Sequence, residues 1–338
     1  MKNKKILITG INGQDGAYLA NYLLKKKNVK IYGLLRRTAN YKLNRLECFG
    51  IEKKIELIYS DICEYDNINR ILNKIKPDIL FNLAAQSYVD YSFTNPKTTF
   101  QINTEAVYNM LETIKQLKLD TKFYQASTSE MYGNSNKLRQ NETTPFFPVS
   151  PYGISKAQSF ELVKTYRNVF NIFASNGILF NHESPYRGSE FVTKKIISTL
   201  SKIKQGSREI LNLGNIDSAR DWGYAGDYMD AINKIMKTEK PNDFVVATGK
   251  TITVRDFFLK VCKELKLNVV RENKKGREIY LNKENNRLIM IVNKKLFRKN
   301  ELNYLCGDYS KIKKQLGWKP KLDINDLIKL MVNFEMSQ

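Results

Sequence analysis

Apolar runs of strand length recur through the first half of the chain, and most are followed by stretches with the spacing of an amphipathic helix. The runs predict six strands, at residues 6–8, 30–35, 55–59, 79–83, 123–127 and 173–179. Helical spacing covers residues 17–26, 68–75 and 103–117, and a long helix opens beside Pro151. Strands that alternate with helices in this order predict an α/β fold with a parallel, doubly wound sheet.

The alternation becomes less regular past residue 183, where lysines grow denser. A chain of 338 residues is long enough for two domains. We expect residues 1–182 to form the first and residues 183–338 a smaller, mainly helical, substrate-binding second. Segments around 214–250 contain further apolar runs and are expected to return to the first domain, whereas residues 274–300 are the least readable part of the chain.

The formal net charge of +22 raises the question of a nucleic-acid partner. The lysines are spread along the whole chain, and no basic block is interleaved with stacking aromatics. The charge therefore indicates a solvated basic surface and no nucleic-acid partner. Such a positive field would still attract an anionic nucleotide substrate.

No apolar run approaches the ~18 residues of a membrane span. The run after the basic N-terminus is too short for a signal peptide, so we expect a cytoplasmic protein with no membrane partner. The four cysteines are scattered, and His182 is the single histidine. These counts argue against a disulfide framework and against a metal site.

The first predicted strand ends in a glycine turn, TGINGQDG at residues 9–16, and a helix follows. Gly10 permits the tight turn, Gly13 lets backbone approach a pyrophosphate, and Gly16 permits close packing of the helix. Amide groups at the helix start would face the phosphates. The strand, turn and helix together predict a Rossmann-type dinucleotide site, although the spacing is G-x-x-G-x-x-G rather than G-x-G-x-x-G.

The second predicted strand ends in Arg36, Arg37 and Thr38. A dinucleotide fold that prefers NAD places an acidic side chain there for the ribose 2′-hydroxyl, whereas arginine accommodates a 2′-phosphate. The arginines therefore favour NADP as the cofactor. Asp61, after the third strand, is placed to approach the adenine.

Tyr152 and Lys156 are four residues apart, on one face of the helix that follows Pro151. A lysine beside a phenol favours the phenolate, so we expect the pKa of Tyr152 to fall and the phenolate to accept a proton from a sugar hydroxyl. Thr128 and Glu130 follow the fifth strand, at the edge of the sheet where ligands bind. They would place a hydroxyl donor and an acid–base carboxylate opposite the tyrosine helix.

These motifs resemble the extended short-chain dehydrogenase/reductase superfamily, and longer stretches resemble one of its families, the GDP-mannose 4,6-dehydratases. The stretches are the glycine turn, QASTSEMYG at 125–133, GILFNHESP at 177–185, FVT at 191–193, RDWG at 220–223, ATG at 247–249 and LGWKP at 316–320. The similarity covers nearly the whole chain. It implies a hydro-lyase that acts on GDP-mannose or a close GDP-manno-sugar, and a homodimer or homotetramer.

The resemblance implies that Tyr152, aided by Lys156 and Thr128, removes the proton of the sugar C4 hydroxyl while hydride passes from C4 to NADP. Glu130 would take the C5 proton as the C6 hydroxyl departs as water. The hydride would then return to C6, which yields the GDP-4-keto-6-deoxy sugar.

The motifs and the resemblance together assign further contacts. Those expected for the cofactor are Gly10, Asn12, Gly13, Gln14, Asp15, Gly16, Arg36, Arg37, Thr38, Asp61, Ile62, Leu83, Ala85, Ser87, Tyr152, Lys156, His182 and Arg187. Those expected for the substrate are Ser87, Glu130, Asn181, Glu183, Val192, Lys195, Arg220, Arg298 and Glu301. Two of the arginines, Arg220 and Arg298, would pair with the diphosphate.

The chain departs from the family pattern at several positions, which are Tyr88, Tyr186, Tyr224, Gly226 and Lys299. The family commonly has histidine in place of Tyr88 and Tyr224, and arginine in place of Tyr186. It commonly has lysine in place of Gly226 and proline in place of Lys299. Such changes would reshape a sugar pocket or a subunit contact, so GDP-D-glycero-D-manno-heptose is an alternative substrate. A nucleotide-sugar epimerase or reductase, which would not need the acid–base carboxylate, and a non-catalytic dinucleotide-binding protein are further alternatives.

Overall fold

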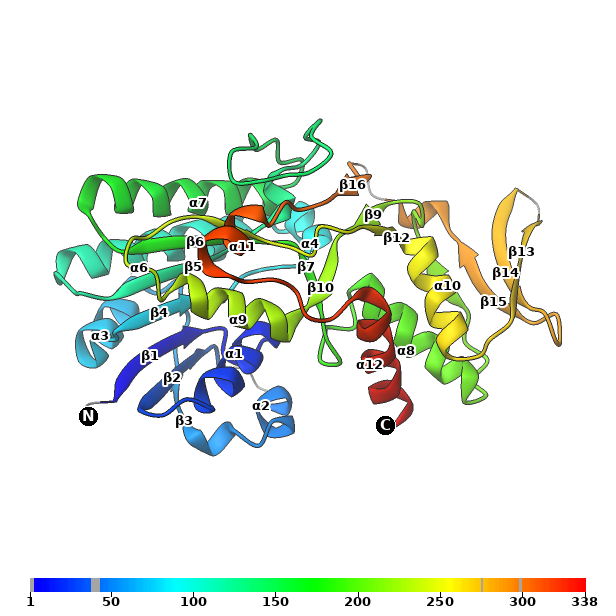
Figure 1. Ribbon diagram of the computed structural model, residues 1–338, viewed down its shortest axis with the longest axis horizontal. Helices are drawn as coiled ribbons and strands as arrows, with labels where there is room; N and C mark the ends of the chain where they lie inside the picture. Colours follow the sequence, from blue (N-terminus) through cyan, green and yellow to red (C-terminus); the bar gives the residue numbers. More distant parts are fainter. Residues whose placement is uncertain (1–2, 38–42, 275, 298–299) are drawn as a thin grey trace.

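The computed structural model describes residues 3–37, 43–274, 276–297 and 300–338. Within these ranges, seven strands form one parallel sheet in the order β11-β6-β5-β4-β1-β2-β3 (Figure 1). The strands are β1 (Lys4–Thr9), β2 (Val29–Leu35), β3 (Ile55–Tyr59), β4 (Ile79–Asn82), β5 (Lys122–Thr128), β6 (Ala174–Leu179) and β11 (Phe244–Val246). The order reverses between β1 and β4, and doubly wound sheets bind their ligands at the carboxyl ends of the strands beside such a reversal.

All six predicted strands are present, with ends that differ from the prediction by at most two residues. The seventh strand, β11, comes from the segment that was expected to return to the first domain, and it pairs with β6. The sequence therefore predicted the six longer strands of the central sheet, and the expected return of the chain to the sheet near residue 244 is confirmed by β11.

One face of the sheet is covered by α1 (Gln14–Leu24) and α9 (Ala225–Ile235), which pack against each other (Figure 1). Their apolar sides meet Ile8 and Tyr124 of the sheet in one buried cluster. Because α9 lies far along the chain, this contact also ties a later segment to the glycine turn.

The opposite face is covered by α3 (Tyr65–Ile75), α6 (Ala106–Gln116) and α7 (Pro151–Phe170). Leu7 and Phe123 point to this side, whereas their next neighbours in sequence face α1. Successive strand residues therefore alternate between two buried cores, as expected of a parallel sheet that helices cover on both faces.

The helix predicted over residues 103–117 begins earlier than expected. α5 (Pro96–Phe100) continues into α6 through a π-helical turn, Gln101–Glu105, and α4 (Val89–Thr94) precedes it. Proline at the first position of α5 suits a helix start, because that position has no need of an amide hydrogen.

Beyond β6 the chain builds a second apolar cluster around α8 (Val192–Lys204), α10 (Val254–Glu264) and α12 (Ile324–Met336), which lie beside one another (Figure 1). Thr253 caps the start of α10 and Asp323 caps the start of α12, each through side-chain hydrogen bonds. None of the helices in the described ranges is long and apolar enough to cross a membrane.

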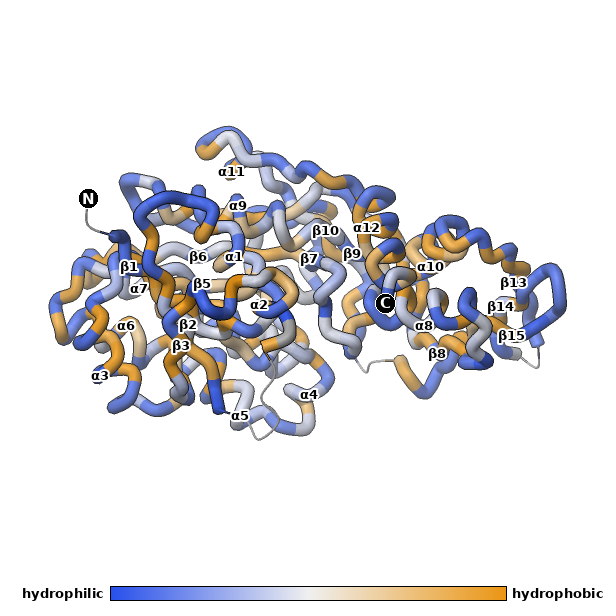
Figure 2. The backbone as a smooth tube through the Cα atoms, turned by 90° about the horizontal axis from the view of Figure 1, so that it is seen from below, coloured by the Kyte–Doolittle hydropathy of each residue, from blue (hydrophilic) through white to orange (hydrophobic). Residues whose placement is uncertain are grey.

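The expectation of a mainly helical second domain did not include a sheet, yet the described part of this region contains one of order β13-β14-β15-β8. Its strands are β8 (Leu211–Leu213), β13 (Val269–Lys274), β14 (Arg277–Asn282) and β15 (Leu288–Val292). The hairpin of β13 and β14 is largely hydrophilic along its length (Figure 2), and β13 is mostly exposed. Its sequence therefore lacks the apolar alternation that predicts a strand.

Two smaller sheets occur in the described ranges. β7 (Asn181–Glu183) pairs with β10 (Trp222–Tyr224), and β9 (Ala219–Arg220) lies between β12 (Ile252–Thr253) and β16 (Tyr304–Leu305). α2 (Asn44–Cys48) lies near α1, and α11 (Ser310–Leu316) near β11. α9 packs on α1, and β11 pairs with β6 in the central sheet, whereas the division into two domains at residue 182 stays a prediction.

Candidate active site

A cavity of about 880 Å³ lies between the carboxyl ends of the central strands and the second apolar cluster. Its volume is in the range of roughly 300–1,000 Å³ that is usual for ligand sites. The predicted residues that line it are Gly10, Asn12, Gly13, Gln14, Asp15, Gly16, Arg36, Asp61, Ile62, Leu83, Ala85, Ser87, Thr128, Glu130, Tyr152, Lys156, Asn181, His182, Arg187, Val192, Lys195, Arg220 and Glu301. The fold thus brings together side chains from Gly10 to Glu301, along most of the chain.

Two predicted residues do not line the cavity, and two more lie outside the described residues. The described residues of the cavity wall do not include Arg37, which is exposed, or Glu183, which is buried behind the wall. Thr38 and Arg298 lie outside the described residues. Arg36 is exposed at the end of β2 and does line the cavity.

The glycine turn forms a close-fitting cradle. Gly10 has a φ of +67°, and a Cβ added there would lie 2.9 Å from the Ala84 backbone. A Cβ on Gly16 would lie 2.3 Å from the Gly10 carbonyl oxygen. Among the described residues, no side chain caps the start of α1 at Gly13, so the first amides of this helix are available to an anion in the cavity.

His182 is held between two hydrogen-bond acceptors. Its Nδ1 atom lies 2.8 Å from the Phe180 carbonyl oxygen, and its Nε2 atom lies 2.9 Å from Oδ2 of Asp15. Burial lowers the pKa of His182, but the charge of Asp15, together with the hydrogen bonds to Asp15 and to the Phe180 carbonyl, raises it above its usual value. Burial raises the pKa of Asp15, but the charge of His182 and its hydrogen bonds lower it to about 2. The geometry and the charges therefore favour an imidazolium paired with a carboxylate.

Gln14 completes this link between the glycine turn and β7. Its Nε2 atom donates to the His182 carbonyl oxygen at 3.1 Å, and its Oε1 atom accepts from the Ser184 hydroxyl at 2.7 Å. Two of the stretches that resemble the family, the glycine turn and residues 177–185, are thus joined by side-chain hydrogen bonds. His182 lines the cavity, and it also fixes the turn that forms the cradle.

The first turn of α7 is fixed by its cap. The amide of Gly153 donates to the Ser150 hydroxyl at 3.0 Å, and Pro151 occupies the first helical position. Tyr152 and Lys156 follow in the first two turns, with 7% and 3% of their surfaces exposed. Both side chains are thereby held against the carboxyl end of β5.

The electrostatics of this pair differ from the prediction. Nζ of Lys156 donates to the Ala126 carbonyl oxygen at 2.9 Å, and burial lowers the pKa of Lys156 to about 8. Burial raises the pKa of Tyr152 to about 12, although a hydrogen bond with Thr128 lowers it. The predicted fall of the Tyr152 pKa is therefore wrong for this environment, because burial of the phenol outweighs the groups that favour the phenolate.

Glu130 lies on the 3₁₀ turn η3 (Ser129–Met131) that follows β5. Its amide donates to the Thr128 hydroxyl at 3.3 Å, which fixes the start of the turn. Its carboxylate is close enough to raise the pKa of Tyr152 electrostatically, in addition to the effect of burial. A hydroxyl, a carboxylate and a phenol thus share one wall of the cavity.

Glu183 supports the wall from behind. It is 1% exposed, its Oε2 atom lies 3.1 Å from Nε of Arg187, and it accepts from the Thr193 hydroxyl at 2.5 Å. The Arg187 guanidinium stacks 3.5 Å from the centre of the Phe191 ring. Glu183 therefore positions Arg187, which itself lines the cavity, rather than facing a ligand directly.

Arg45 is a residue of the cavity wall that the sequence analysis missed. Its Nε atom donates to the Tyr186 carbonyl oxygen at 2.8 Å, and Nη1 donates to the Asn12 carbonyl oxygen at 3.2 Å. Burial lowers the pKa of this guanidinium. No motif identifies it, because α2 is short and carries no glycine or strand signal that would place it beside the glycine turn.

The departures from the family pattern lie mostly outside the cavity. Of those in the described ranges, Tyr88 alone lines it. The rings of Tyr186 and Tyr224 pack instead on Tyr18, at 6.1 and 5.8 Å between ring centroids. A Cβ on Gly226 would lie 2.4 Å from the Tyr224 ring, so the glycine makes room for that tyrosine. These three departures form one local packing arrangement.

Comparison with known proteins bears on these observations. The family profile described as GDP-mannose 4,6 dehydratase matches residues 7–331. The chain is 40% identical to the GDP-mannose 4,6 dehydratase of Homo sapiens over 338 residues, which cover 98% of this chain and 91% of that protein. It is 38% identical to the GDP-mannose 4,6-dehydratase of Yersinia enterocolitica, over 99% of this chain and 94% of that protein.

Two solved structures share the fold. The dTDP-glucose 4,6-dehydratase of Streptomyces venezuelae, with NAD bound, has a TM-score of 0.83 at 19% identity over 98% of this chain and 96% of that one. The UDP-glucose 4-epimerase of Thermotoga maritima has a TM-score of 0.82 at 21% identity over 98% of both chains. At these identities the likeness shows a common fold.

Proposed function

The chain belongs to the GDP-mannose 4,6-dehydratase family, and we propose on this basis that it is a hydro-lyase converting GDP-mannose to the GDP-4-keto-6-deoxy sugar. The single observation that supports the chemistry best is that Thr128, Glu130 and Tyr152 line the same cavity as the glycine cradle. An epimerase or reductase would not need the carboxylate at this position. A purely non-catalytic binding protein would need none of the three.

We propose NADP as the cofactor. The cradle fits a pyrophosphate, because Gly10 and Gly16 leave no room for side chains and α1 begins without a described side-chain cap. Arg36 at the end of β2 supplies a positive charge for a 2′-phosphate at a position where an acidic side chain would favour NAD. When bound, NADP would supply the acceptor, and later the donor, of a hydride.

The residues of the wall divide the proton transfers among them. Tyr152 would remove the proton of the sugar C4 hydroxyl, with Thr128 hydrogen-bonded to its oxygen and Lys156 one helical turn away. The resulting C4 carbonyl acidifies the proton at C5. Glu130 would remove that proton while the C6 hydroxyl leaves as water, so that the overall change in the sugar is the loss of one water.

The substrate would lie against the part of the cavity that the second apolar cluster covers. Arg220 and Lys195 line that part and would balance the charge of a diphosphate, and Glu301 lies on the same wall. Nζ of Lys195 already donates to the Asn212 carbonyl oxygen at 2.7 Å, which orients the side chain. Arg187, held by Glu183, would complete the cationic lining.

GDP-mannose is favoured over the GDP-heptose. The relatives reported above are named for GDP-mannose, and two of the tyrosines that prompted the alternative pack in the aromatic cluster away from the cavity. We further propose that the chain forms two domains divided near residue 182. We also propose that it assembles into a homodimer or a homotetramer, and light scattering on the purified protein would distinguish these two states.

The direct test is incubation of the purified protein and NADP with GDP-mannose, with the product analysed by mass spectrometry. We expect a product lighter than the substrate by one water. Tyr152→Phe should form that product at least about 100-fold more slowly under the same conditions. Absence of the product from the wild-type reaction, or dehydration of GDP-D-glycero-D-manno-heptose in its place, would overturn the proposal.

A further inference from the structure

Ser127 lines the cavity beside Thr128, yet the proton of its hydroxyl is directed away from the cavity. Its Oγ atom donates to Oδ1 of Asn176 on β6 at 3.1 Å. Both residues are buried, with 3% and 0% of their surfaces exposed. Because a hydroxyl has one proton and two lone pairs, this bond leaves Ser127 with acceptor capacity alone for other partners.

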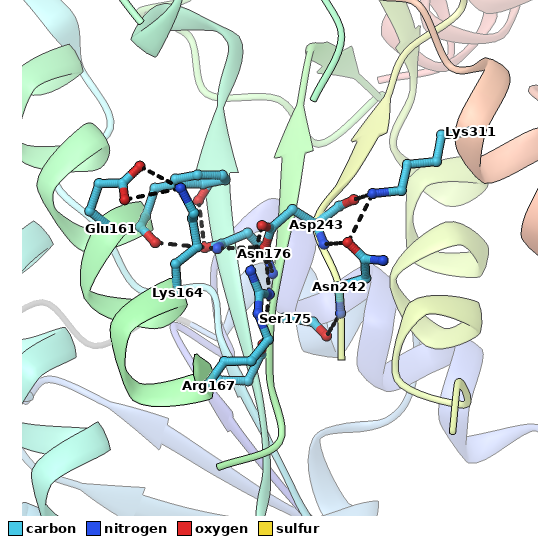
Figure 3. A network of polar contacts seen from close by, with 11 residues as sticks. Glu161, Lys164, Arg167, Ser175, Asn176, Asn242, Asp243 and Lys311 are labelled. Carbon is cyan, nitrogen blue, oxygen red and sulfur yellow. Dashed lines mark hydrogen bonds and ion pairs between the residues drawn. The ribbon is translucent and has the colours of Figure 1, made fainter. Parts of the chain in front are cut away.

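The direction of this hydrogen bond is set by a charge farther from the cavity. Asp243 accepts from Nη1 and Nη2 of Arg167 at 2.8 and 2.6 Å, and from Nδ2 of Asn176 at 2.9 Å (Figure 3). An ionised carboxylate accepts hydrogen bonds and donates none. Asn176 must therefore turn its amide nitrogen to Asp243 and its carbonyl oxygen to Ser127, which must then donate.

The Asp243 carboxylate is held in place by its ion pair with Arg167. The Arg167 and Asp243 side chains are 12% and 11% exposed, and their contact is bidentate. Arg167 lies on α7, the helix of Tyr152, and Asp243 directly precedes β11. The chain of contacts thus crosses from α7 and β11 through β6 to the end of β5.

We propose that Ser127 is a ligand-binding residue that offers the bound ligand only a hydrogen-bond acceptor, and that Asp243 and Asn176 are positioning residues that enforce this polarity. The inference rests on the proposed function, because it concerns the ligands of the same cavity. The group that it selects is an N–H or O–H donor. Two sources fit this chemistry, the carboxamide of a nicotinamide and a hydroxyl of the hexose.

The test uses Ser127→Ala with Ser175→Ala as its matched control. Ser175 is equally buried on β6 and accepts from the Asn242 amide at 3.1 Å, but the described residues of the cavity wall do not include it. Calorimetry measures the affinity of each protein for NADP, for the NADP analogue with acetyl in place of the carboxamide, and for GDP-mannose. Thermal melting records the stability of each variant.

We expect Ser127→Ala to bind its donor-bearing ligand about 3- to 10-fold more weakly, the usual effect of one lost hydrogen bond. If the donor is the carboxamide, the wild type prefers NADP to the acetyl analogue and Ser127→Ala loses that preference. If the donor is a sugar hydroxyl, the affinity for GDP-mannose falls and the preference is unchanged. Unchanged affinities for all ligands, or equal losses in Ser175→Ala, would overturn the proposal.

Asp243→Asn tests whether the Asp243 carboxylate fixes the direction of the hydrogen bond between Ser127 and Asn176. A neutral amide at this position allows Asn176 to turn over and Ser127 to aim its proton into the cavity, so the affinity for the donor-bearing ligand should fall as in Ser127→Ala. The double variant should lose nothing more. If Asp243→Asn does not fold, Asn176→Leu, which leaves the pair of Arg167 and Asp243 intact, should still weaken the binding of the donor-bearing ligand. Wild-type affinity of Asn176→Leu for the ligand that Ser127→Ala binds more weakly would contradict the inference.

The outcomes separate this inference from the proposed function. Wild-type protein that dehydrates GDP-mannose, together with a Ser127→Ala variant that binds every ligand normally, would contradict this inference and leave the proposed function intact. Wild-type protein without dehydratase activity, together with weakened ligand binding in Ser127→Ala, would contradict the proposed function and leave the role of Ser127 intact.

Discussion

Nε2 of His182 lies 2.9 Å from Oδ2 of Asp15, although 167 positions separate them in the sequence. The pair joins the glycine turn to β7. Burial opposes both charges, yet the attraction between them lowers the pKa of Asp15 to about 2 and raises that of His182. The shape of the cofactor cradle thus depends on an ion pair whose two partners come from different motifs.

Removing one charge of this pair should destabilise the protein in a pH-dependent way. A pKa lowered from 3.8 to about 2 corresponds to about 2 kcal/mol of stability, which Asp15→Asn should lose. The Asp15 contribution is present above its unfolded pKa of 3.8 and is lost as the pH falls towards 2. The His182 contribution is fully present below its ordinary pKa of 6.5 and is lost as the pH rises through its raised value.

Urea unfolding of both proteins between about pH 4 and about pH 9 measures this difference. The difference in the free energy of unfolding should be largest at the acidic end of that window and shrink towards the alkaline end. A difference that is constant across the window would show that the pair is not charged in the folded protein.

The phenol of Tyr152 should be needed for turnover and not for binding. Tyr152→Phe keeps the ring and removes the oxygen, so kcat should fall by at least about 100-fold while the KM for GDP-mannose stays near its wild-type value. Steady-state kinetics supply both numbers. Tyr132→Phe is the matched control, because Tyr132 is equally buried and donates to the Asn141 carbonyl oxygen at 2.7 Å outside the cavity.

Tyr132→Phe should lower the melting temperature and leave kcat close to wild type. If the two variants lose turnover equally, the role of Tyr152 in proton transfer is contradicted, and general loss of structure explains both.

Neighbouring arginines give a sharp test of the cofactor. Arg36 lines the cavity at the end of β2, whereas the exposed Arg37 is not among its described lining residues. Arg36→Ala should lower the affinity for NADP by about 10-fold or more, because a charged hydrogen bond to the 2′-phosphate is lost. The affinity for NAD, which has no 2′-phosphate, should stay nearly unchanged. Fluorescence titration with both dinucleotides measures this.

Arg37→Ala should leave both affinities unchanged. An equal loss for NAD and NADP in Arg36→Ala, or a larger loss in Arg37→Ala, would place the 2′-phosphate elsewhere.

The local patterns predicted much of this architecture. The six strands, the glycine turn and the tyrosine helix could be read from the sequence because each depends on neighbours a few positions away: apolar runs, glycine spacing and a Ser-Pro helix start. The β13–β14 hairpin could not, because its outer strand is exposed and charged and its pairing comes from the fold. The π-helical turn before α6 likewise has no sequence signal that the analysis could use.

The site was predicted less completely for the same reason. The contact of His182 with Asp15 joins segments that only the fold brings together. Arg45 reaches the glycine turn from a short helix without a motif. The pKa of Tyr152 was predicted in the wrong direction, because spacing shows that a lysine is near but does not show how deeply the phenol is buried.

The carboxylate of Glu130 should be needed for elimination and not for oxidation. Glu130→Gln keeps the size of the side chain and removes the base, so the reaction should stop after hydride transfer from C4. Addition of GDP-mannose should then produce the absorbance of the reduced nicotinamide, which stopped-flow spectroscopy records. Glu142→Gln is the control, because Glu142 accepts from the Val245 amide at 2.8 Å and is not among the described residues of the cavity wall.

Glu142→Gln should turn over without accumulation of that absorbance. If Glu130→Gln also shows no reduced nicotinamide, or forms product at the wild-type rate, Glu130 is not the base at C5.

The central claim is that one hydride leaves C4 of the hexose and returns to C6 of the same molecule within this cavity. Incubation of the wild-type protein with GDP-mannose that carries deuterium at C4 tests it most directly, with the product analysed by NMR and mass spectrometry. The account predicts one deuterium at C6 of the 4-keto-6-deoxy sugar and none released to the solvent. Deuterium that remains at C4, or that is lost from the product, would contradict it.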